Sequence, residues 1–277
     1  MLKLLERNIR VIGQRLVLVA PASTAPPNTF VNIAVDTARH DQLVRRMQAF
    51  RGAIYLQEGN VKRHQLTVDG RHQTPEDDKS WHLLMVDPGG QISSCAWYRN
   101  HDDPKSIDDL RIRTCPLMGL DEWRGKLAGA VESEITRARE AGLRYAELGG
   151  WAILGERRGT PEELMMALAT YSLSRVLGGA LGITTANVAH SCSSILRRFG
   201  GSHLEFEGTA IPPYFDPQYN TNIELLRFDS RSPNTKYVGL IDIVKEQLVN
   251  ASVIASPLEI GRAEPRPAAR RVSRAAY

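Results

Sequence analysis

The sequence predicts a protein of the α/β class, in which strands and helices alternate along one chain. Short segments with alternating apolar and polar residues are separated by longer segments with helical periodicity. Their predicted order is β-α-β-β-α-β-α-β-α-β, which is typical of a mixed sheet packed in layers with helices. The chain has 277 residues, of which 42% are hydrophobic and 24% are charged. It is therefore long enough, and ordinary enough in composition, to bury the core of such a fold.

The individual elements follow from local patterns. A strand is predicted at residues 30–37, and a helix at 38–59 ends at Gly59. WHLLMVD and QISSCAWYR then form a β-hairpin around the turn DPGG. The later elements are a helix ending near Gly142, a strand at 145–154, a helix at 161–178, a strand at 182–188, a helix at 189–200, strands at 203–208 and 222–229, and a helix within 235–260.

Composition divides the chain into four segments. Residues 1–29 are expected to be an N-terminal extension with a linker rich in Pro, Ser and Thr, although Val11 to Ala20 is apolar enough for an added edge strand. Residues 30–230 form the main domain, and residues 231–261 a C-terminal helical extension. Residues 262–277 carry five arginines against one glutamate and are expected to be a disordered basic tail.

Several classes of function are disfavoured. The sequence contains no GxGxxG or GxxxxGK[ST] motif, and the net charge of +4 is mild, so no nucleotide or nucleic-acid partner is expected. Three cysteines without CxxC spacing indicate core residues rather than a metal site, and RHQTPEDDK is interpreted as a solvated loop. No apolar run approaches the length of a membrane span, and the charged N-terminus is a poor secretory signal. We expect a cytoplasmic protein with no metal.

The segment at 145–178 combines a strand, a basic turn and a helix. Period-two alternation places Glu147 on the same strand face as Trp151. Thr160 is a natural helix N-cap, Pro161 suits the first helical position, and Glu163 completes a capping box. A carboxylate on a strand that leads into such a turn suggests acyl transfer from a pantetheine thioester.

The turn itself is a candidate phosphate site. Backbone N–H groups at a helix N-terminus attract anions. The expected pantetheine-phosphate ligands are Arg157, Arg158, Gly159 and Thr160. The alternative is a solvated basic turn.

A succession of motifs resembles a known family. FRGAIYLQEG, VDG, SCAWYR, AELGGWAI, ALATYSLSR and SSILRRFG occur in the order and spacing seen in the acyl-homoserine-lactone synthases and the long-chain N-acyl amino acid synthases. The resemblance covers Val31 to Asp229. It implies a GNAT-like acyltransferase domain at 30–230, a three-layer fold in which helices flank a mixed central sheet. It also implies an N-acyltransferase that moves an acyl group from acyl-carrier protein or acyl-coenzyme A to a small amine, with an amino acid the expected acceptor.

The resemblance assigns roles only where residues match. Glu147 is the expected catalytic base, with a pKa raised by apolar surroundings, unless it pairs with a neighbouring arginine. Trp97 and Trp151 are expected to line the acyl pocket, and core packing is their alternative role. The expected acceptor-binding residues are Arg51, Tyr55, Asp69 and Arg99. Arg51 is a candidate clamp for a carboxylate, although an arginine near a helix C-terminus also favours the helix dipole.

Three departures from the family disfavour S-adenosylmethionine and lactone formation. Gly150 stands where those synthases have an arginine, Val61 where they have a tryptophan, and His72 where they have a second acid. No permanently bound cofactor is expected, since the phosphopantetheine of carrier protein or coenzyme A enters as a co-substrate. The alternatives are a true acyl-homoserine-lactone synthase, a short-chain GNAT acetyltransferase and a non-catalytic binding or regulatory module.

Overall fold

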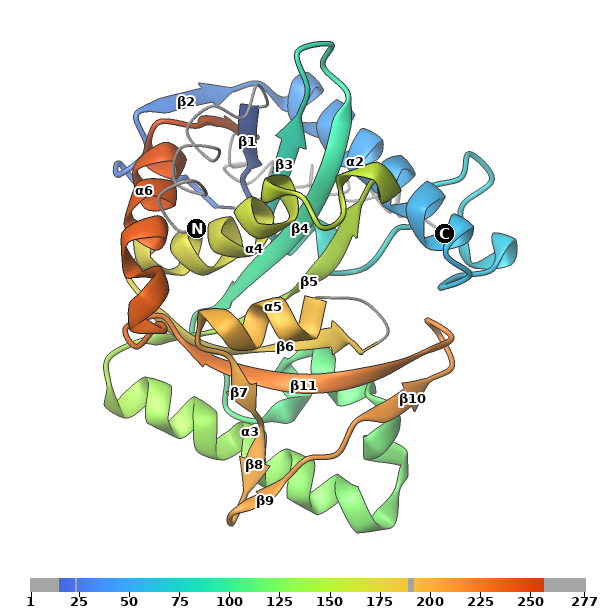
Figure 1. Cartoon of the computed structure of the whole chain (residues 1–277), viewed down its shortest axis with the longest axis vertical. Coiled ribbons are helices and arrows are strands. Elements are labelled where there is room, and N and C mark those ends of the chain that lie inside the picture. The colour runs from blue at the N-terminus through green and yellow to red at the C-terminus, as the bar shows by residue number, and fades with distance from the viewer. Residues whose placement is uncertain (1–14, 23, 189–191, 257–277) are drawn as a thin grey trace, which may run out of the picture.

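The central feature of the computed structural model is one large mixed β-sheet (Figure 1). The structure describes residues 15–22, 24–188 and 192–256. The strand order is β10-β11-β6-β5-β4-β3-β1-β12-β2, and β7 pairs with β11 beside this path. β5 is parallel to β6, and β12 is parallel to both of its neighbours, whereas the other pairs are antiparallel. The strands are β1 (Arg15–Val19), β2 (Asn32–Val35), β3 (Trp81–Val86), β4 (Ile92–His101), β5 (Arg144–Ile153), β6 (Ala180–Asn187), β7 (Ser202–His203), β10 (Tyr214–Asp216), β11 (Thr221–Asp229) and β12 (Ser252–Ala255), with β8 (Glu205–Phe206) and β9 (Thr209–Ala210) forming a separate small sheet.

Helices cover both faces of the sheet and make a three-layer structure. α2 (Thr37–Gln57) and α3 (Asp121–Glu140) pack on one face. α4 (Pro161–Val176), α5 (Cys192–Phe199) and α6 (Val238–Val249) pack on the other. Short 3-10 turns occupy the loops, at Arg63–Gln65, Asp77–Lys79, Ile107–Asp109, Arg111–Thr114, Pro116–Gly119, Gly155–Arg157 and Thr235–Tyr237. This arrangement confirms the predicted three-layer fold.

The two helices that frame the site begin with side-chain caps. Asp36 accepts a hydrogen bond from the Arg39 N–H at the start of α2. Thr160 accepts one from the Glu162 N–H at the start of α4, where Pro161 is the first residue, as predicted. Glu163 reaches back one residue further than a capping box requires and accepts from the Gly159 N–H at 2.7 Å. Caps of this kind fix where each helix starts, because they satisfy N–H groups that have no partner within the helix.

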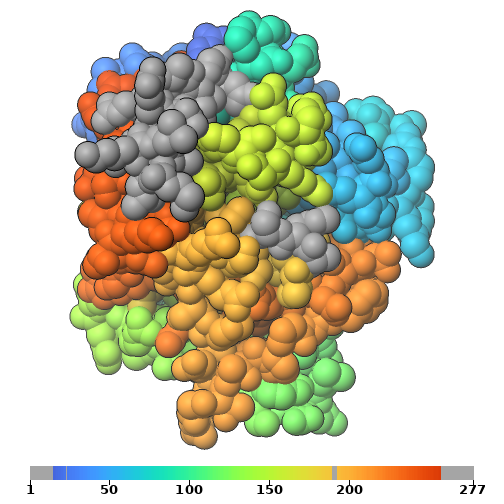
Figure 2. All heavy atoms as spheres, in the orientation of Figure 1, coloured from blue at the N-terminus to red at the C-terminus, as the bar shows by residue number. Residues whose placement is uncertain are grey.

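Both ends of the described chain belong to the sheet. β1 lies between β3 and β12, and β12 lies between β1 and β2. Figure 2 shows these N-terminal and C-terminal segments together on one side of the molecule. The boundaries expected near residues 30 and 230 therefore do not separate structural units, and the added strand expected at Val11 to Ala20 is internal rather than at the edge. The predicted tail at 262–277 lies outside the described residues.

A β-bulge in β5 changes which residues share a face. The β4–β5 register pairs Trp97 with Gly149 but Cys95 with Ala152, so β5 carries one extra residue. Gly150 has a φ of +61°, which glycine adopts readily. Glu147 consequently stays on the α3 side, whereas Trp151 packs on the α4 side. The prediction that Glu147 and Trp151 point the same way is wrong, because the bulge reverses the alternation between them.

Candidate active site

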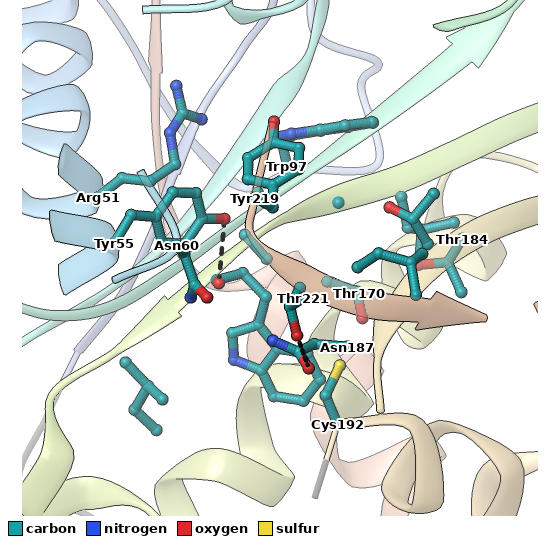
Figure 3. A pocket seen from close by; sticks show the side chains of 18 of the residues that line it. Arg51, Tyr55, Asn60, Trp97, Thr170, Thr184, Asn187, Cys192, Tyr219 and Thr221 are labelled. Carbon is teal, nitrogen blue, oxygen red and sulfur yellow. Dashed lines mark hydrogen bonds between the residues drawn. The ribbon is translucent and has the colours of Figure 1, made fainter. Parts of the chain in front are cut away.

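A cavity opens where β5 and β6 separate. Their parallel ladder ends at the pair Leu148 and Thr184, in the part of the chain that the structure describes. Beyond that pair, the cavity encloses about 140 Å³. Figure 3 shows Tyr55 from α2, Trp97 from β4 and Tyr219 from the loop before β11 around it. Strand separation beside the bulge thus opens the cavity.

Two tryptophans line the cavity next to the bulge. The Trp97 indole lies against the backbone of the two glycines, since a Cβ on Gly149 or Gly150 would come within 2.6 or 2.1 Å of it. Trp151 lines the cavity as well, and its backbone oxygen accepts a hydrogen bond from the Tyr55 hydroxyl at 3.2 Å. The structure therefore brings Trp97, Trp151 and Tyr55 to one cavity.

Arg51 lines the same cavity but is held in a buried ion pair. Its Nη2 donates to both carboxylate oxygens of Asp77, at 2.9 and 2.8 Å, and to the His72 carbonyl at 2.6 Å. Asp77 also accepts from Gln48 Nε2 and from the Thr74 N–H. Burial raises the pKa of Asp77, but the charge of Arg51, the nearby His82 and the hydrogen bonds from Arg51 and Thr74 together outweigh burial and hold the pKa below its usual range. Most of the Arg51 charge is thus neutralised within the protein.

This network contradicts the interpretation of RHQTPEDDK as a solvated loop. His72 is 4% exposed and Asp77 is 2% exposed. The sequence contained a signal for this buried network, because Arg51 follows Met47 by four residues on the apolar face of its helix. A buried arginine requires an acid partner, and the acid comes from the following loop.

Aromatic rings form the wall beside Arg51. The Tyr55 ring centroid lies 5.3 Å from that of His72 and 6.0 Å from that of Tyr219, and the His72 and Tyr219 rings are 6.1 Å apart. Burial and the nearby Arg51 charge lower the pKa of His72 to about 4. The His72 imidazole is therefore neutral at pH 7, whereas the family pattern has a charged acid at this position.

Glu147 has a different environment from the one predicted. Its Oε2 accepts from His101 Nε2 and from the Arg111 N–H, both at 2.9 Å, and its Oε1 accepts from the Ile112 N–H at 3.0 Å. Burial raises the pKa of Glu147, but these hydrogen bonds outweigh burial and hold the pKa below its ordinary value. The predicted raised pKa is wrong, because the carboxylate anchors the loop that follows β4.

Arg111 is a cavity residue that the sequence analysis missed. Its Nη2 donates to the Tyr219 hydroxyl at 2.8 Å, and its Nε lies 3.6 Å from Glu76 Oε2. It lines the main cavity and, together with Glu147, a smaller one beside Trp97. Arg111 lies in an irregular segment between β4 and α3, where no periodic pattern marks a residue as functional.

The predicted phosphate turn lies at the end of β5, and Arg158 from it lines the cavity. Arg158 pairs with Glu58, and Arg157 Nε is 3.6 Å from Glu162 Oε2. Gly159 donates its N–H to Glu163, and Thr160 caps α4. The turn therefore has the expected position, but carboxylates already contact several of its donors.

Two predicted acceptor residues lie apart from the cavity wall. Asp69 is 61% exposed and accepts from Thr67 and Arg71, its neighbours in the loop. Arg99 pairs with Glu147 in the β4–β5 register. Neither is among the described residues that line the cavity, whereas Arg51 and Tyr55 are.

The described residues contain neither a candidate metal cluster nor a helix that could span a membrane. No cluster of three or more histidine, cysteine or acidic side chains is placed to hold a metal ion. No described helix combines the length and apolar character needed to cross a membrane.

Comparison with known proteins places this geometry in a structural class. No family model and no curated protein sequence matches the chain. Among solved structures, BjaI, a CoA-dependent acyl-homoserine lactone synthase with SAM and isopentyl-CoA, has a TM-score of 0.54 at 12% identity, over 88% of this chain and 94% of that one. TofI, in a ternary complex with an inhibitor and MTA, has a TM-score of 0.52 at 11% identity, over 84% and 99%. MesI, another CoA-dependent acyl-homoserine lactone synthase, has a TM-score of 0.51 at 11% identity, over 86% and 98%.

The chain thus has the fold of two CoA-dependent acyl-homoserine lactone synthases, BjaI and MesI. The predicted resemblance and the predicted fold class are both confirmed.

Proposed function

We propose that the protein is an N-acyltransferase that moves an acyl group from a pantetheine thioester to the amine of a small acceptor, an amino acid. The observation that carries the proposal is the cavity between the separated ends of β5 and β6, next to the bulge at Gly150. It occurs on the fold of two CoA-dependent acyl-homoserine lactone synthases.

The exposed edge of β5 suits an extended thioester arm. Residues 149–153 have no ladder partner in β6, so backbone groups on that side of β5 are available to the amides of pantetheine, apart from the Trp151 carbonyl, which accepts from Tyr55. The arm then runs toward the turn at 157–160, where Arg158 and the start of α4 receive its phosphate. Binding at this turn requires the phosphate to compete with Glu58 for Arg158.

Acyl transfer needs relief of negative charge on the tetrahedral oxygen and removal of a proton from the amine. The bulge takes Gly150 and Trp151 out of the β4–β5 register, and in this proposal the N–H groups so released from the ladder stabilise the tetrahedral oxygen. His72 replaces Glu147 as the candidate proton acceptor, directly or through water. It lines the cavity, it is neutral at pH 7, and its buried Nδ1 has no hydrogen-bond partner among the described residues.

The acceptor chemistry separates this proposal from a true acyl-homoserine-lactone synthase. The family arginine has no room at position 150, because a Cβ there would lie 2.1 Å from Trp97 and Gly150 has a positive φ. The BjaI structure contains SAM, so S-adenosylmethionine belongs in any test of acceptors.

The donor is either acyl-carrier protein or acyl-coenzyme A. Arg197 and Arg198 are exposed on α5, whose Cys192 and Leu196 line the cavity. Positive charge beside the entrance favours an acidic carrier protein, and it also favours the phosphates of coenzyme A.

The decisive experiment incubates the purified full-length chain with acyl-carrier protein or acyl-coenzyme A of several chain lengths. The acceptors are the amino acids and S-adenosylmethionine, and the measurements are thiol release and product mass. We expect thiol release that depends on an amino acid, with an N-acyl amino acid as the product. A lactone made from S-adenosylmethionine would support the synthase alternative, and no acceptor-dependent release with any donor would contradict the proposed function.

A further inference from the structure

Arg51 and Arg111, two of the arginines that line the cavity, differ in how far neighbouring carboxylates neutralise their charge. Arg51 and Asp77 form an ion pair in which both side chains are 1% exposed. Arg111 is 20% exposed, and its acidic partner, Glu76, lies 3.6 Å away, beyond ordinary hydrogen-bond distance. Arg111 is therefore the less neutralised of the two guanidinium groups and the more accessible to an anion.

Hydrogen bonds to both its backbone and its side chain also hold Arg111 in a defined orientation. Its backbone N–H donates to Glu147 Oε2 at 2.9 Å, and the neighbouring Ile112 N–H donates to the other carboxylate oxygen at 3.0 Å. Its side chain donates to the Tyr219 hydroxyl at 2.8 Å, with the guanidinium 5.9 Å from the centre of that ring. Such fixation reduces the entropy lost when a ligand binds to the remaining N–H groups.

The burial of Glu147 indicates why a carboxylate is retained there. Glu147 is 3% exposed, and its carboxylate receives three hydrogen bonds, two of them from the backbone at Arg111 and Ile112. A carboxylate can accept from both backbone groups at once, whereas an amide can accept at only one of its two atoms. Glu147 therefore controls the position of the segment that carries Arg111.

We propose that Arg111 binds the carboxylate of the acceptor substrate and that Glu147 is the positioning residue that holds Arg111 in place. This inference rests on the N-acyltransferase function proposed above. The acceptor is then an amino acid whose carboxylate pairs with the guanidinium and whose amine reaches toward the gap between β5 and β6. The rings of Tyr55, His72 and Tyr219 form the wall next to the rest of the acceptor.

The test compares each amino acid with the amine that lacks only its carboxylate, for example phenylalanine and 2-phenylethylamine. In the Arg111→Gln variant we expect the KM for the amino acid to rise about 10- to 100-fold, the range for losing a charged hydrogen-bond partner. The KM for the amine and for the thioester donor should stay unchanged. Arg113→Gln is the matched control, because Arg113 is an exposed neighbour in the same 3-10 turn.

The role of Glu147 is tested by non-additivity. Glu147→Gln should raise the KM for the amino acid but not for the amine, and it should add little in the Arg111→Gln background. Glu134→Gln is its control, since Glu134 is equally buried but pairs with Arg137 and Arg227 outside the cavity. A Glu147→Gln variant that impairs both acceptors equally would overturn the positioning role.

The outcomes distinguish this inference from the proposed function. Wild-type protein that acylates the amine as well as the amino acid, or an Arg111→Gln variant that weakens both equally, would overturn the carboxylate site while the acyltransferase stands. If the wild-type protein releases no thiol with any acceptor, the function itself fails and the inference fails with it.

Discussion

At the scale of single residues, the partners of a carboxylate decide its role. Glu147 and Asp77 are both buried acids near the cavity, and each accepts several hydrogen bonds within the protein. Neither is available as a strong base, because those contacts hold the pKa of each below its ordinary value against the effect of burial. His72 differs from them not in base strength, since its pKa is lowered to about 4, but in lining the cavity with an Nδ1 that has no hydrogen-bond partner among the described residues.

Replacing Asp77 by asparagine should destabilise the protein strongly. The change leaves the Arg51 charge buried without its acid, which costs about 3–5 kcal/mol in the free energy of unfolding at pH 7. The pKa of Asp77 is lowered from 3.8 in the folded protein, so its contribution is fully present above that value and is lost as the pH falls below it. The difference between wild type and variant should therefore shrink in acid.

Urea denaturation at pH 7 and at successively lower pH measures this effect. Asp78→Asn is the matched control, because Asp78 is an exposed neighbour in the same turn. Equal stabilities for the two variants at pH 7 would show that the buried ion pair does not stabilise the fold.

At the scale of elements, the bulge in β5 shapes the site. It reverses the faces of the strand between Glu147 and Trp151, and it places the two glycines under the Trp97 indole. Sequence periodicity cannot detect such a reversal, because one inserted residue leaves the apolar pattern on both sides intact. Only the adjacent glycines indicated that the strand was irregular.

Gly150→Ala should disturb the site more than the addition of one methyl group suggests. The new Cβ would lie 2.1 Å from Trp97 and 3.2 Å from the Arg51 side chain, and alanine would have to adopt a φ of +61°. We expect a loss of stability of about 1–3 kcal/mol and a large fall in acyl transfer. Thermal unfolding and the thiol-release assay measure the two effects.

The control for this change is Gly155→Ala, a position with open space around its Cβ and no positive φ. A Gly150→Ala protein with the stability and activity of this control would contradict the role given to the bulge.

At the scale of the whole molecule, the sheet joins the two ends of the described chain. β12 pairs with both β1 and β2, and α6 packs on α4, where Ser172 donates to the Ile241 carbonyl at 3.1 Å. The side chains of Val253 and Ile254 are 0% and 1% exposed. The C-terminal strand is therefore as central to the core as any strand near the cavity.

Truncation tests this architecture. A chain that ends at residue 256 retains β12 and should keep a cooperative unfolding transition. A chain that ends at residue 250 removes β12 and leaves β2 without its only partner strand among the described residues, so it should be insoluble or unfolded. Circular dichroism and size-exclusion chromatography compare the two, and a folded protein from the shorter chain would contradict the central role of β12.

The sequence predicted a mixed α/β layer architecture, the hairpin at 81–99 and the cap at Thr160, because each depends on local patterns that periodicity and capping rules detect, while the three-layer arrangement came from the resemblance to a family. Five of the residues that it singled out line the cavity: Arg51, Tyr55, Trp97 and Trp151 from the resemblance to a family, and Arg158 from the basic turn. The apolar position of Arg51 indicated that it needs an acid partner, but which acid supplies it was out of reach, as was the Glu147–Arg111 contact. Both contacts connect a regular element to a loop whose path no local pattern specifies. The pairing of β1 with β12 was out of reach for a related reason, because strand pairing across more than 200 residues leaves no local signal.

The position of β12 also has a consequence for biosynthesis. A ribosome releases the N-terminus first, so β1 and β2 emerge long before the strand that must fit between them. Until residue 255 has left the exit tunnel, β1 and β2 lack the strand that lies between them, and the apolar side chains that β12 covers stay exposed. Completion of the sheet therefore waits for a strand made more than 200 residues after β1, and during that interval the unfinished chain is a natural client for chaperones.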